Sequence, residues 1–429
     1  MKTPASFNFL DLDVQRDPLP FFAVLREQAP VYREPQTGVY LVTRAKEVRY
    51  VAEHPELFSN IIDPTVFRVC QGLSLEEKDP EVAARLREKA WLVPHTLLFS
   101  DPPIHARYRR LAVEALSPKA VKKLIPFIEQ QVQRFMPPFD SGEAVDFVSA
   151  FTERVPIATV QRFVGAPEAD RELINRWTHQ FFSTQLGQTS REEYLRTVDA
   201  ICELFNYIAA RIEAVRKKRD GTLIDDLLHA HEKTGDEPLT LEELISMFHV
   251  LMLAGHDTTR QALASGMRLL ATNPALCLQL RSNPEQIGSF TEEVIRMYSP
   301  ANLTPRIAAA DTELGGFTIP KGATVFLCWG AANRDPRAFP NPDSFECPRE
   351  RGTEHYGFGA GPHFCVGNRL ARTTTGIAFN AFLQRYQSIE LAVPESELRY
   401  MPSANLRALE SLPIRCKGAM RAPVAPALA

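Results

Sequence analysis

The sequence predicts a mainly α-helical protein with small β-sheets. From about residue 103 to residue 300, apolar side chains recur with helical periodicity almost without interruption. Short stretches with the alternation typical of strands stand on either side of this region. No motif repeats at a spacing of about 20–50 residues, which argues against a solenoid.

The β-strands are expected in two small units. Near the N-terminus, residues 31–34 (VYRE) and 39–42 (VYLV) alternate around a Pro-Gln-Thr-Gly connection, which predicts a β-hairpin. After the helical region, residues 314–319 and 323–327 flank Pro320-Lys321-Gly322, and we expect a second β unit there.

The clearest helix begins after Thr240, whose side chain can cap it while Glu243 reaches back to form a capping box. It ends before Asn273-Pro274. At 1.5 Å per residue, about 32 residues span about 48 Å, enough to cross a whole domain. Its middle, residues 247–255, is apolar nearly all round and should be buried. Further helices are expected over 119–136, 170–185, 191–218, 285–298 and 366–386.

Composition excludes several classes of protein. The 429 residues include 49 Lys and Arg against 52 Asp and Glu, a net charge of −3, which argues against a nucleic-acid partner. With 45% apolar and 24% charged residues, the chain has the composition of a soluble globular protein rather than a disordered one. There is no apolar run long enough for a membrane anchor, and the N-terminus does not resemble a signal peptide.

The seven cysteines are odd in number and include no C-x-x-C spacing, so neither a disulfide framework nor a zinc knuckle is expected. A cytoplasmic location follows from this usage. Prolines cluster after residue 300, which predicts a turn-rich segment there.

The most informative segment is FGAGPHFCVG, residues 358–367. A dinucleotide-binding G-x-G-x-x-G motif fails because Pro362 and Phe364 stand where glycine is required. Cys365 directly precedes a predicted helix, whose N-terminal dipole favours a thiolate. Glycines ahead of it would let a flat ligand approach the backbone. The pattern indicates a thiolate ligand to a metal in a planar macrocycle, whereas a lone cysteine is ordinarily a buried apolar thiol.

This segment resembles the haem-binding loop F-x-x-G-x-x-x-C-x-G of the cytochrome P450 family, with Cys365 at the position of the axial thiolate. The resemblance implies haem b as the cofactor and the family's mostly helical, triangular fold. It implies a single haem domain over residues 1–416, followed by a flexible tail over 417–429.

A second motif lies inside the long helix, where residues 254–259 (AGHDTT) resemble the family's A-G-x-D/E-T-T oxygen-activation motif. Gly255 would let the helix loosen beside the haem. The resemblance implies that Thr258 donates a hydrogen bond where dioxygen binds and that Asp257 relays protons. The alternative is an ordinary helix bend or a threonine bonded back to its own helix.

Two further sets of residues match the family in order along the chain. Glu293 and Arg296 resemble its E-x-x-R pair, with Arg349 as the third member of a structural triad that locks the segment ahead of Cys365. Taken alone, such a pair is usually a surface salt bridge. The resemblance also implies that four cationic or N–H-donating residues hold the haem propionates. These anchors are His105, Arg109, Arg306 and His363.

The activity implied is monooxygenation, in which one oxygen atom of O2 enters an apolar small molecule. The chain carries no recognisable flavin or nicotinamide segment, so a ferredoxin and a ferredoxin reductase are the expected electron donors. A cationic surface for an acidic partner is expected from Arg107, Arg110, Lys122 and Lys123. The protein is expected to be a monomer of the soluble bacterial type.

Position within the family also implies pocket residues, mainly apolar, with Asn302 and Asn405 as polar anchors. The segment over 64–98 would cover the pocket. Two alternatives remain, a peroxide-using haem-thiolate enzyme and a non-enzymatic haem sensor. The presence of Asp257 and Thr258 argues against the first, and the lack of an effector segment argues against the second. The pocket candidates are Val250, Leu253, Ala254, Asn302, Leu303 and residues 404–406.

Overall fold

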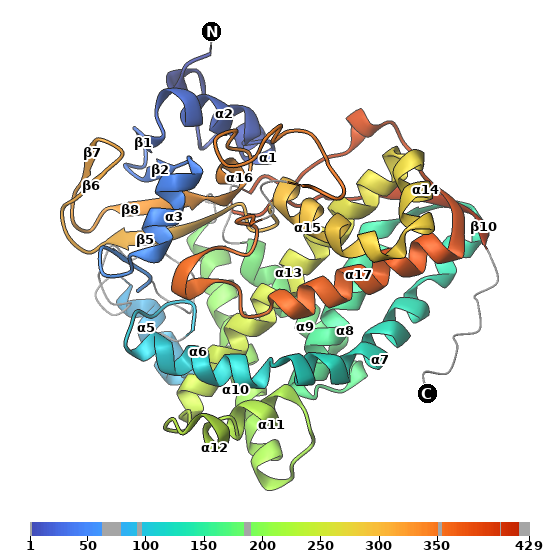
Figure 1. The fold of residues 1–429 in the computed structure, drawn as a ribbon. Helices are drawn as coiled ribbons and strands as arrows, with labels where there is room; N and C mark the ends of the chain where they lie inside the picture. Colours follow the sequence, from blue (N-terminus) through green and yellow to red (C-terminus); the bar gives the residue numbers. More distant parts are fainter. Residues whose placement is uncertain are drawn as a thin grey trace.

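The computed structural model describes residues 2–61, 79–91, 97–183, 190–350, 354–403 and 405–419. Helices fill most of the molecule, and a small sheet lies to one side of them (Figure 1). The predicted class, mainly α with small sheets, is confirmed. Much of the expected pocket cover over 64–98 lies outside the described residues.

The helices of the described residues include all those that the periodicity predicts, with boundaries within a few residues. Their bounds are α1 Leu12–Arg16, α2 Leu19–Gln28, α3 Ala45–Glu53, α5 Pro80–Lys89, α6 Ile104–Ala115, α7 Pro118–Phe135, α8 Arg154–Val164, α9 Arg171–Ser183, α10 Arg191–Lys217, α11 Leu223–Leu228, α12 His231–Thr234, α13 Leu241–Thr272, α14 Pro274–Ser282, α15 Ile287–Tyr298, α16 Trp329–Ala332 and α17 Asn368–Arg385.

Within the described residues the strands form three sheets. The largest has the order β1 (Val31–Arg33), β2 (Tyr40–Val42), β8 (Thr324–Cys328), β5 (Leu303–Ala308) and β3 (Phe58–Ser59). The others are β4 (Ala144–Asp146), β10 (Pro413–Ala419) and β9 (Tyr386–Leu391), and the pair β6 (Thr312–Leu314) and β7 (Phe317–Ile319).

The first predicted hairpin is confirmed, because β1 and β2 pair antiparallel with Tyr32 opposite Leu41. The second prediction is wrong in its pairing. Residues 312–319 form their own hairpin, β6 with β7, because Gly315 and Gly316 both adopt positive φ (59° and 83°) at its turn. Strand β8 instead pairs in parallel with β2 and antiparallel with β5.

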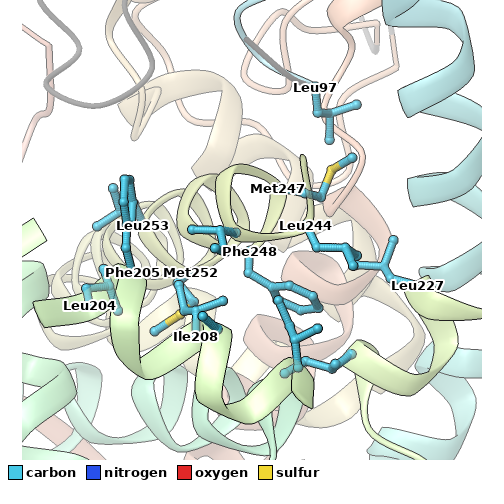
Figure 2. Close-up of a cluster of buried hydrophobic side chains, with 14 of the residues drawn as sticks. Leu97, Leu204, Phe205, Ile208, Leu227, Leu244, Met247, Phe248, Met252 and Leu253 are labelled. Carbon is cyan, nitrogen blue, oxygen red and sulfur yellow. The ribbon is translucent and has the colours of Figure 1, made fainter. Parts of the chain in front are cut away.

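Helix α13 crosses the molecule (Figure 1) and begins as predicted. Thr240 accepts a hydrogen bond from the backbone of Glu243, and the Glu243 carboxylate accepts one from the backbone of Thr240. Figure 2 shows its apolar residues against those of α10, with Phe248 and Phe205 both buried. Because apolar side chains of α13 are buried against those of α10, α13 lies in the interior of the fold.

Helix α17 packs against α13, and Figure 1 shows the two helices next to each other. Gly266 of α13 leaves room for the Phe379 ring, because a Cβ at position 266 would lie 2.3 Å from the ring. The Cys365 loop is therefore tied to the central helix through α17.

The predicted tail begins too early, because β10 continues to Ala419 and pairs Lys417 with Ser388. Residues 420–429 lie outside the described residues. No helix among the described residues is long and apolar enough to cross a membrane.

Candidate functional site

The loop before α17 folds back on itself around Cys365. The Cys365 backbone N–H donates to the carbonyl oxygen of Phe358 (2.8 Å), and that of Phe364 donates to Gly361 (3.0 Å). The Asn368 side-chain amide donates to the Cys365 carbonyl oxygen (2.7 Å), where the helix begins. These bonds fix the direction in which the thiol leaves the loop.

Two glycines, Gly357 and Gly361, allow close packing of this segment onto helices, whereas the approach of a ligand to its glycines stays a prediction. A Cβ on Gly361 would lie 2.4 Å from the carbonyl oxygen of Ala52 in α3, and φ at Gly361 is +67°. A Cβ on Gly357 would lie 2.5 Å from Ile295 of α15. The loop is thus clamped between two helices.

The thiol of Cys365 is only partly exposed to solvent. Burial raises its pKa, although a hydrogen bond from the Gly367 backbone and the charges of Arg109 and Arg372 act in the opposite direction. Burial therefore outweighs the helix start and the nearby cations in its effect on the pKa of this thiol. Coordination to a metal ion deprotonates a thiol outright, so a metal would supply the missing stabilisation.

No group of three or more His, Cys, Asp or Glu residues that could hold a metal ion occurs in the described part of the chain. A haem brings ligands of its own for its iron, and when bound it would take its thiolate ligand from Cys365.

The four predicted anchor residues are brought together from three segments: His105 and Arg109 from α6, Arg306 from β5 and His363 from the Cys365 loop. The rings of His105 and His363 lie 4.0 Å apart between centroids, and Arg109 and Arg306 are close enough to act on both. Arg109 also donates to the carbonyl oxygen of Phe364. Asp101 lies beside them but already accepts hydrogen bonds from Ser59 and Asn60.

This cluster is electrostatically incomplete. Burial, followed by the neighbouring arginines, lowers the pKa of His105 to about 4, and burial lowers that of Arg306 to about 10. Buried nitrogens with no hydrogen-bond partner among the described residues include His105 Nε2, His363 Nε2 and Arg306 Nε. Donors left in this way require an acceptor. Two carboxylates would supply it, so these residues fit the propionates of a haem.

Helix α13 presents the motif residues in two directions. Ala254 is exposed although its helix is otherwise largely buried, which indicates that this face borders open space. The Thr258 hydroxyl donates to the Ala254 carbonyl oxygen (2.6 Å), which is the back-bonded arrangement of the alternative interpretation. Asp257 is buried and paired with Arg260 (3.3 Å), which also contacts Glu153 (3.2 Å). Asp257, Arg260 and Glu153 form a row of charged side chains, and Glu153 at its end is partly exposed to solvent.

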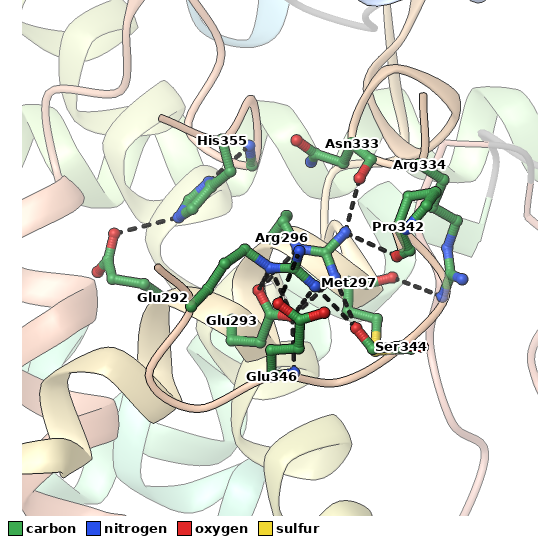
Figure 3. A network of polar contacts seen from close by, with 12 residues as sticks. Glu292, Glu293, Arg296, Met297, Asn333, Arg334, Pro342, Ser344, Glu346 and His355 are labelled. Atoms are coloured by element: carbon green, nitrogen blue, oxygen red, sulfur yellow. Dashed lines mark hydrogen bonds and ion pairs between the residues drawn. The ribbon is translucent and has the colours of Figure 1, made fainter. Parts of the chain in front are cut away.

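The predicted triad is assembled and buried, not a surface salt bridge. Glu293 accepts two hydrogen bonds of 2.7 Å from Arg296, and Arg349 Nη2 donates to it at 2.9 Å. Burial alone would raise the pKa of Glu293, but the hydrogen bonds from the two arginines lower it. Figure 3 shows Arg296 reaching past Glu293 to backbone carbonyls of the turn-rich segment.

Asn333 connects this triad to the Cys365 loop. Its carbonyl oxygen accepts a hydrogen bond from Arg296 (2.7 Å), and its side-chain oxygen accepts one from the backbone of Tyr356 (2.6 Å). Sequence reasoning missed Asn333, because nothing in its local sequence shows that it bridges two segments.

The pocket candidates do not all face the same space. Leu253 is 2% exposed in the core around α10 (Figure 2), and Leu303 is 3% exposed in a cluster beside α2. Both are as buried as Val250, which is 3% exposed, and their place in the pocket stays a prediction. Val250 packs with Phe99 and Ile307, two residues that the sequence did not identify.

The two predicted polar anchors are adjacent. The backbone N–H of Asn302 donates to the carbonyl oxygen of Asn405 (2.7 Å), and Asn302 is buried whereas Asn405 is partly exposed. Ala404 lies outside the described residues.

The expected cationic docking surface is smaller than predicted. Arg107 is held by Glu243 (2.9 Å) and Arg110 by Asp236 (2.5 Å), so neither guanidinium is available as an unpaired charge. Lys122 and Lys123 are exposed on α7.

Comparison with known proteins gives consistent matches. A family model described as Cytochrome P450 matches residues 75–291 and 285–404. The biotin biosynthesis cytochrome P450 of Bacillus subtilis (strain 168) is 32% identical over 93% of this chain and 96% of its own length. The mycinamicin IV hydroxylase/epoxidase of Micromonospora griseorubida is 31% identical over 92% and 94%. The crystal structure of P450BioI with a hexadec-9Z-enoic acid ligated acyl carrier protein has a TM-score of 0.82 and 29% identity, covering 94% of this chain and 100% of that one.

Proposed function

The chain belongs to the cytochrome P450 family of haem monooxygenases, and we propose that Cys365 ligates the haem iron and that the substrate is a largely apolar acyl compound. The observation that carries the first part is that the loop presenting Cys365 also contributes to a cluster of two arginines and two histidines, in which buried nitrogens of His105, His363 and Arg306 have no hydrogen-bond partner among the described residues. Such a pairing of one thiolate ligand with an anion-binding cluster fits a haem that carries propionates.

When bound, haem supplies the oxygen chemistry of the family, in which one atom of O2 enters the substrate and the other leaves as water, with two electrons and two protons consumed. On our proposal, His105, Arg109, Arg306 and His363 hold the propionates. The triad of Glu293, Arg296 and Arg349 would hold the Cys365 loop in place through Asn333, which bonds to Arg296 and to the backbone of Tyr356.

We propose that the α13 motif delivers protons. The Thr258 hydroxyl can exchange its bond to Ala254 for one to dioxygen by rotating about χ1, since it lies on the face that Ala254 leaves open. Asp257 would take protons from the solvent side, where Glu153 is partly exposed, and release them toward that face, while Arg260 holds the two carboxylates in place.

The substrate proposal rests on the relatives and on the apolar wall. P450BioI is described with an acyl carrier protein ligated to a hexadec-9Z-enoic acid, and another relative is a biotin biosynthesis enzyme. In this chain, Val250, Phe99 and Ile307 form an apolar cluster that suits an alkyl chain. Asn302 and Asn405 would orient its polar end.

The electron donors proposed are a ferredoxin and its reductase. A cytochrome P450 requires redox partners, and the exposed lysines of α7, Lys122 and Lys123, offer positive charge to an acidic partner.

The test is a titration of the haem-loaded protein with three sets of compounds. These are free long-chain fatty acids, the same acyl chains on an acyl carrier protein, and macrolactones of similar size. We expect the acyl compounds, free or carried, to shift the ferric spin state and to gain one oxygen atom when ferredoxin, reductase and O2 are supplied. A response to the macrolactones alone would overturn the acyl proposal.

A further inference from the structure

Behind the Cys365 loop, a chain of polar contacts connects α15 to the proposed iron ligand. We call its members His355, Glu292, Arg372 and Asn368 the proximal network. His355 Nε2 lies 3.1 Å from Glu292 Oε2 (Figure 3), and Arg372 holds both oxygens of Glu292 at 2.6 and 2.8 Å. Arg372 also donates to the Asn368 side-chain oxygen, while the Asn368 amide donates to the Cys365 carbonyl oxygen.

Arg372 is fixed in orientation by this arrangement. Its guanidinium makes a bidentate contact with Glu292 and lies 4.3 Å from the centroid of the Phe358 ring. Phe358 in turn accepts the backbone hydrogen bond of Cys365. The cation therefore lies against both ends of the loop that presents the thiol.

The partner of Arg372 is also fixed. The Gly357 backbone N–H donates to His355 Nδ1 (3.0 Å), so the neutral ring carries its proton on Nε2 and donates it to Glu292. The His355 side chain is 4% exposed, and those of Glu292 and Arg372 are 33% and 37% exposed. The pair thus faces the buried loop on one side and solvent on the other.

Neither charge has a part in the propionate cluster or in the triad. The bidentate pair contributes to stability, but its position gives it a second effect. Arg372 lies against the Cys365 loop at Phe358, and Glu292 lies directly behind Arg372.

We propose that Arg372 and Glu292 are positioning residues that set the reduction potential of the haem through Cys365, and that they act in opposite directions. Reduction adds one electron, supplied by the reductant, to the haem and its thiolate. A nearby cation stabilises the added negative charge, and a nearby anion opposes it. Arg372 also orients the Asn368 amide, which withdraws electron density through the Cys365 carbonyl. This inference rests on the proposed ligation by Cys365.

The test is a redox titration of the purified haem-loaded protein with mediator dyes and dithionite, without any protein partner. We expect Arg372→Gln to shift the potential to more negative values and Glu292→Gln to shift it to less negative values. Arg372→Lys should retain most of the wild-type potential, because it keeps the charge while losing the bidentate geometry. Arg369→Gln is the matched control, since Arg369 is exposed in the same turn of α17, and it should leave the potential unchanged.

Opposite shifts distinguish an electrostatic role from a structural one. If the network only supports folding, Arg372→Gln and Glu292→Gln should both lower thermal stability. Their reduction potentials should then equal that of the wild type or shift in the same direction as each other. Either result would show that the inference is wrong. The carbon monoxide spectrum of each reduced variant is recorded in parallel. A wild-type protein without the thiolate type of spectrum would refute the ligation by Cys365 itself, whereas a normal spectrum with unshifted potentials refutes only the proximal network.

Discussion

Thr258 shows how far a residue type can be interpreted without its neighbours. The A-G-x-D-T-T resemblance identified a hydroxyl and a carboxylate next to each other, and both lie on the central helix. Glu153 could not be predicted as part of this group, because it meets Arg260 only when α8 packs on α13, whereas Arg260 and Ala254 are local partners on the same helix. The same holds for Asn333, whose two hydrogen bonds join segments far apart in the sequence.

Replacing Thr258 by alanine should separate oxygen chemistry from binding. Among the described residues the hydroxyl bonds to its own helix, so its loss should cost less than about 1 kcal/mol of folding stability and should leave haem and substrate binding intact. We expect a larger share of electrons to appear as hydrogen peroxide, measured as peroxide and product formed per NADPH consumed. Thr258→Ser keeps the hydroxyl and should remain coupled, and unchanged coupling in Thr258→Ala would reject the proton role.

At the scale of elements, the sequence predicts helices well because their periodicity is local. It does not predict which face meets which neighbour, and the separate apolar clusters that contain Leu253 and Leu303 could not be foreseen for that reason. The second β unit was mispaired because β2 and β8 are separated by most of the chain, whereas the Gly315-Gly316 turn is a local signal that was overlooked.

The contact between α13 and α17 predicts an overpacking effect at Gly266. A methyl group there would meet the Phe379 ring at 2.3 Å, so Gly266→Ala should lower the free energy of unfolding by about 1–3 kcal/mol. In α15, Gly288→Ala meets no atom within 4 Å and should be neutral or stabilising by up to about 1 kcal/mol. Urea unfolding of both variants checks this contrast, and equal midpoints would contradict the packing.

The buried triad predicts a large effect from removing one arginine. Arg349→Met leaves the carboxylate of Glu293 buried with one cationic partner, which should cost about 3–5 kcal/mol. We expect faster loss of haem on mild heating as well, because the triad supports the Cys365 loop through Asn333. Lys46→Met, on the exposed face of α3, should stay within about 0.5 kcal/mol of wild type. A similar loss in both variants would argue against a specific triad.

For the whole molecule, depressed carboxylate pKa values predict acid sensitivity. Burial opposes the effect, but hydrogen bonds from Arg372 and His355 lower the pKa of Glu292 to about 2. A carboxylate with a lowered folded pKa contributes its stability fully above its unfolded pKa, about 4.3, and loses it as the pH falls toward the folded value. Glu292→Gln should therefore show a shallower fall in urea midpoint between about pH 4.3 and pH 2 than wild type. An identical pH profile would contradict this ion pair.

The overall architecture was the most predictable feature, since composition and helical periodicity restrict it and the family motifs occur in order from residue 101 to residue 367. What links those motifs into one site is tertiary contact, seen in the four anchors that converge from α6, β5 and the Cys365 loop. All of these contacts surround one thiol.

The most direct test of ligation by Cys365 is the absorption spectrum of the reduced, haem-loaded protein with carbon monoxide. We expect the red-shifted Soret band of a thiolate-ligated haem, and its loss in Cys365→Ser. Cys277→Ser, which changes a buried thiol that donates to the Leu270 carbonyl oxygen in the core, should keep the band. A histidine-type spectrum in the wild-type protein, or a thiolate band that persists in Cys365→Ser, would contradict the account.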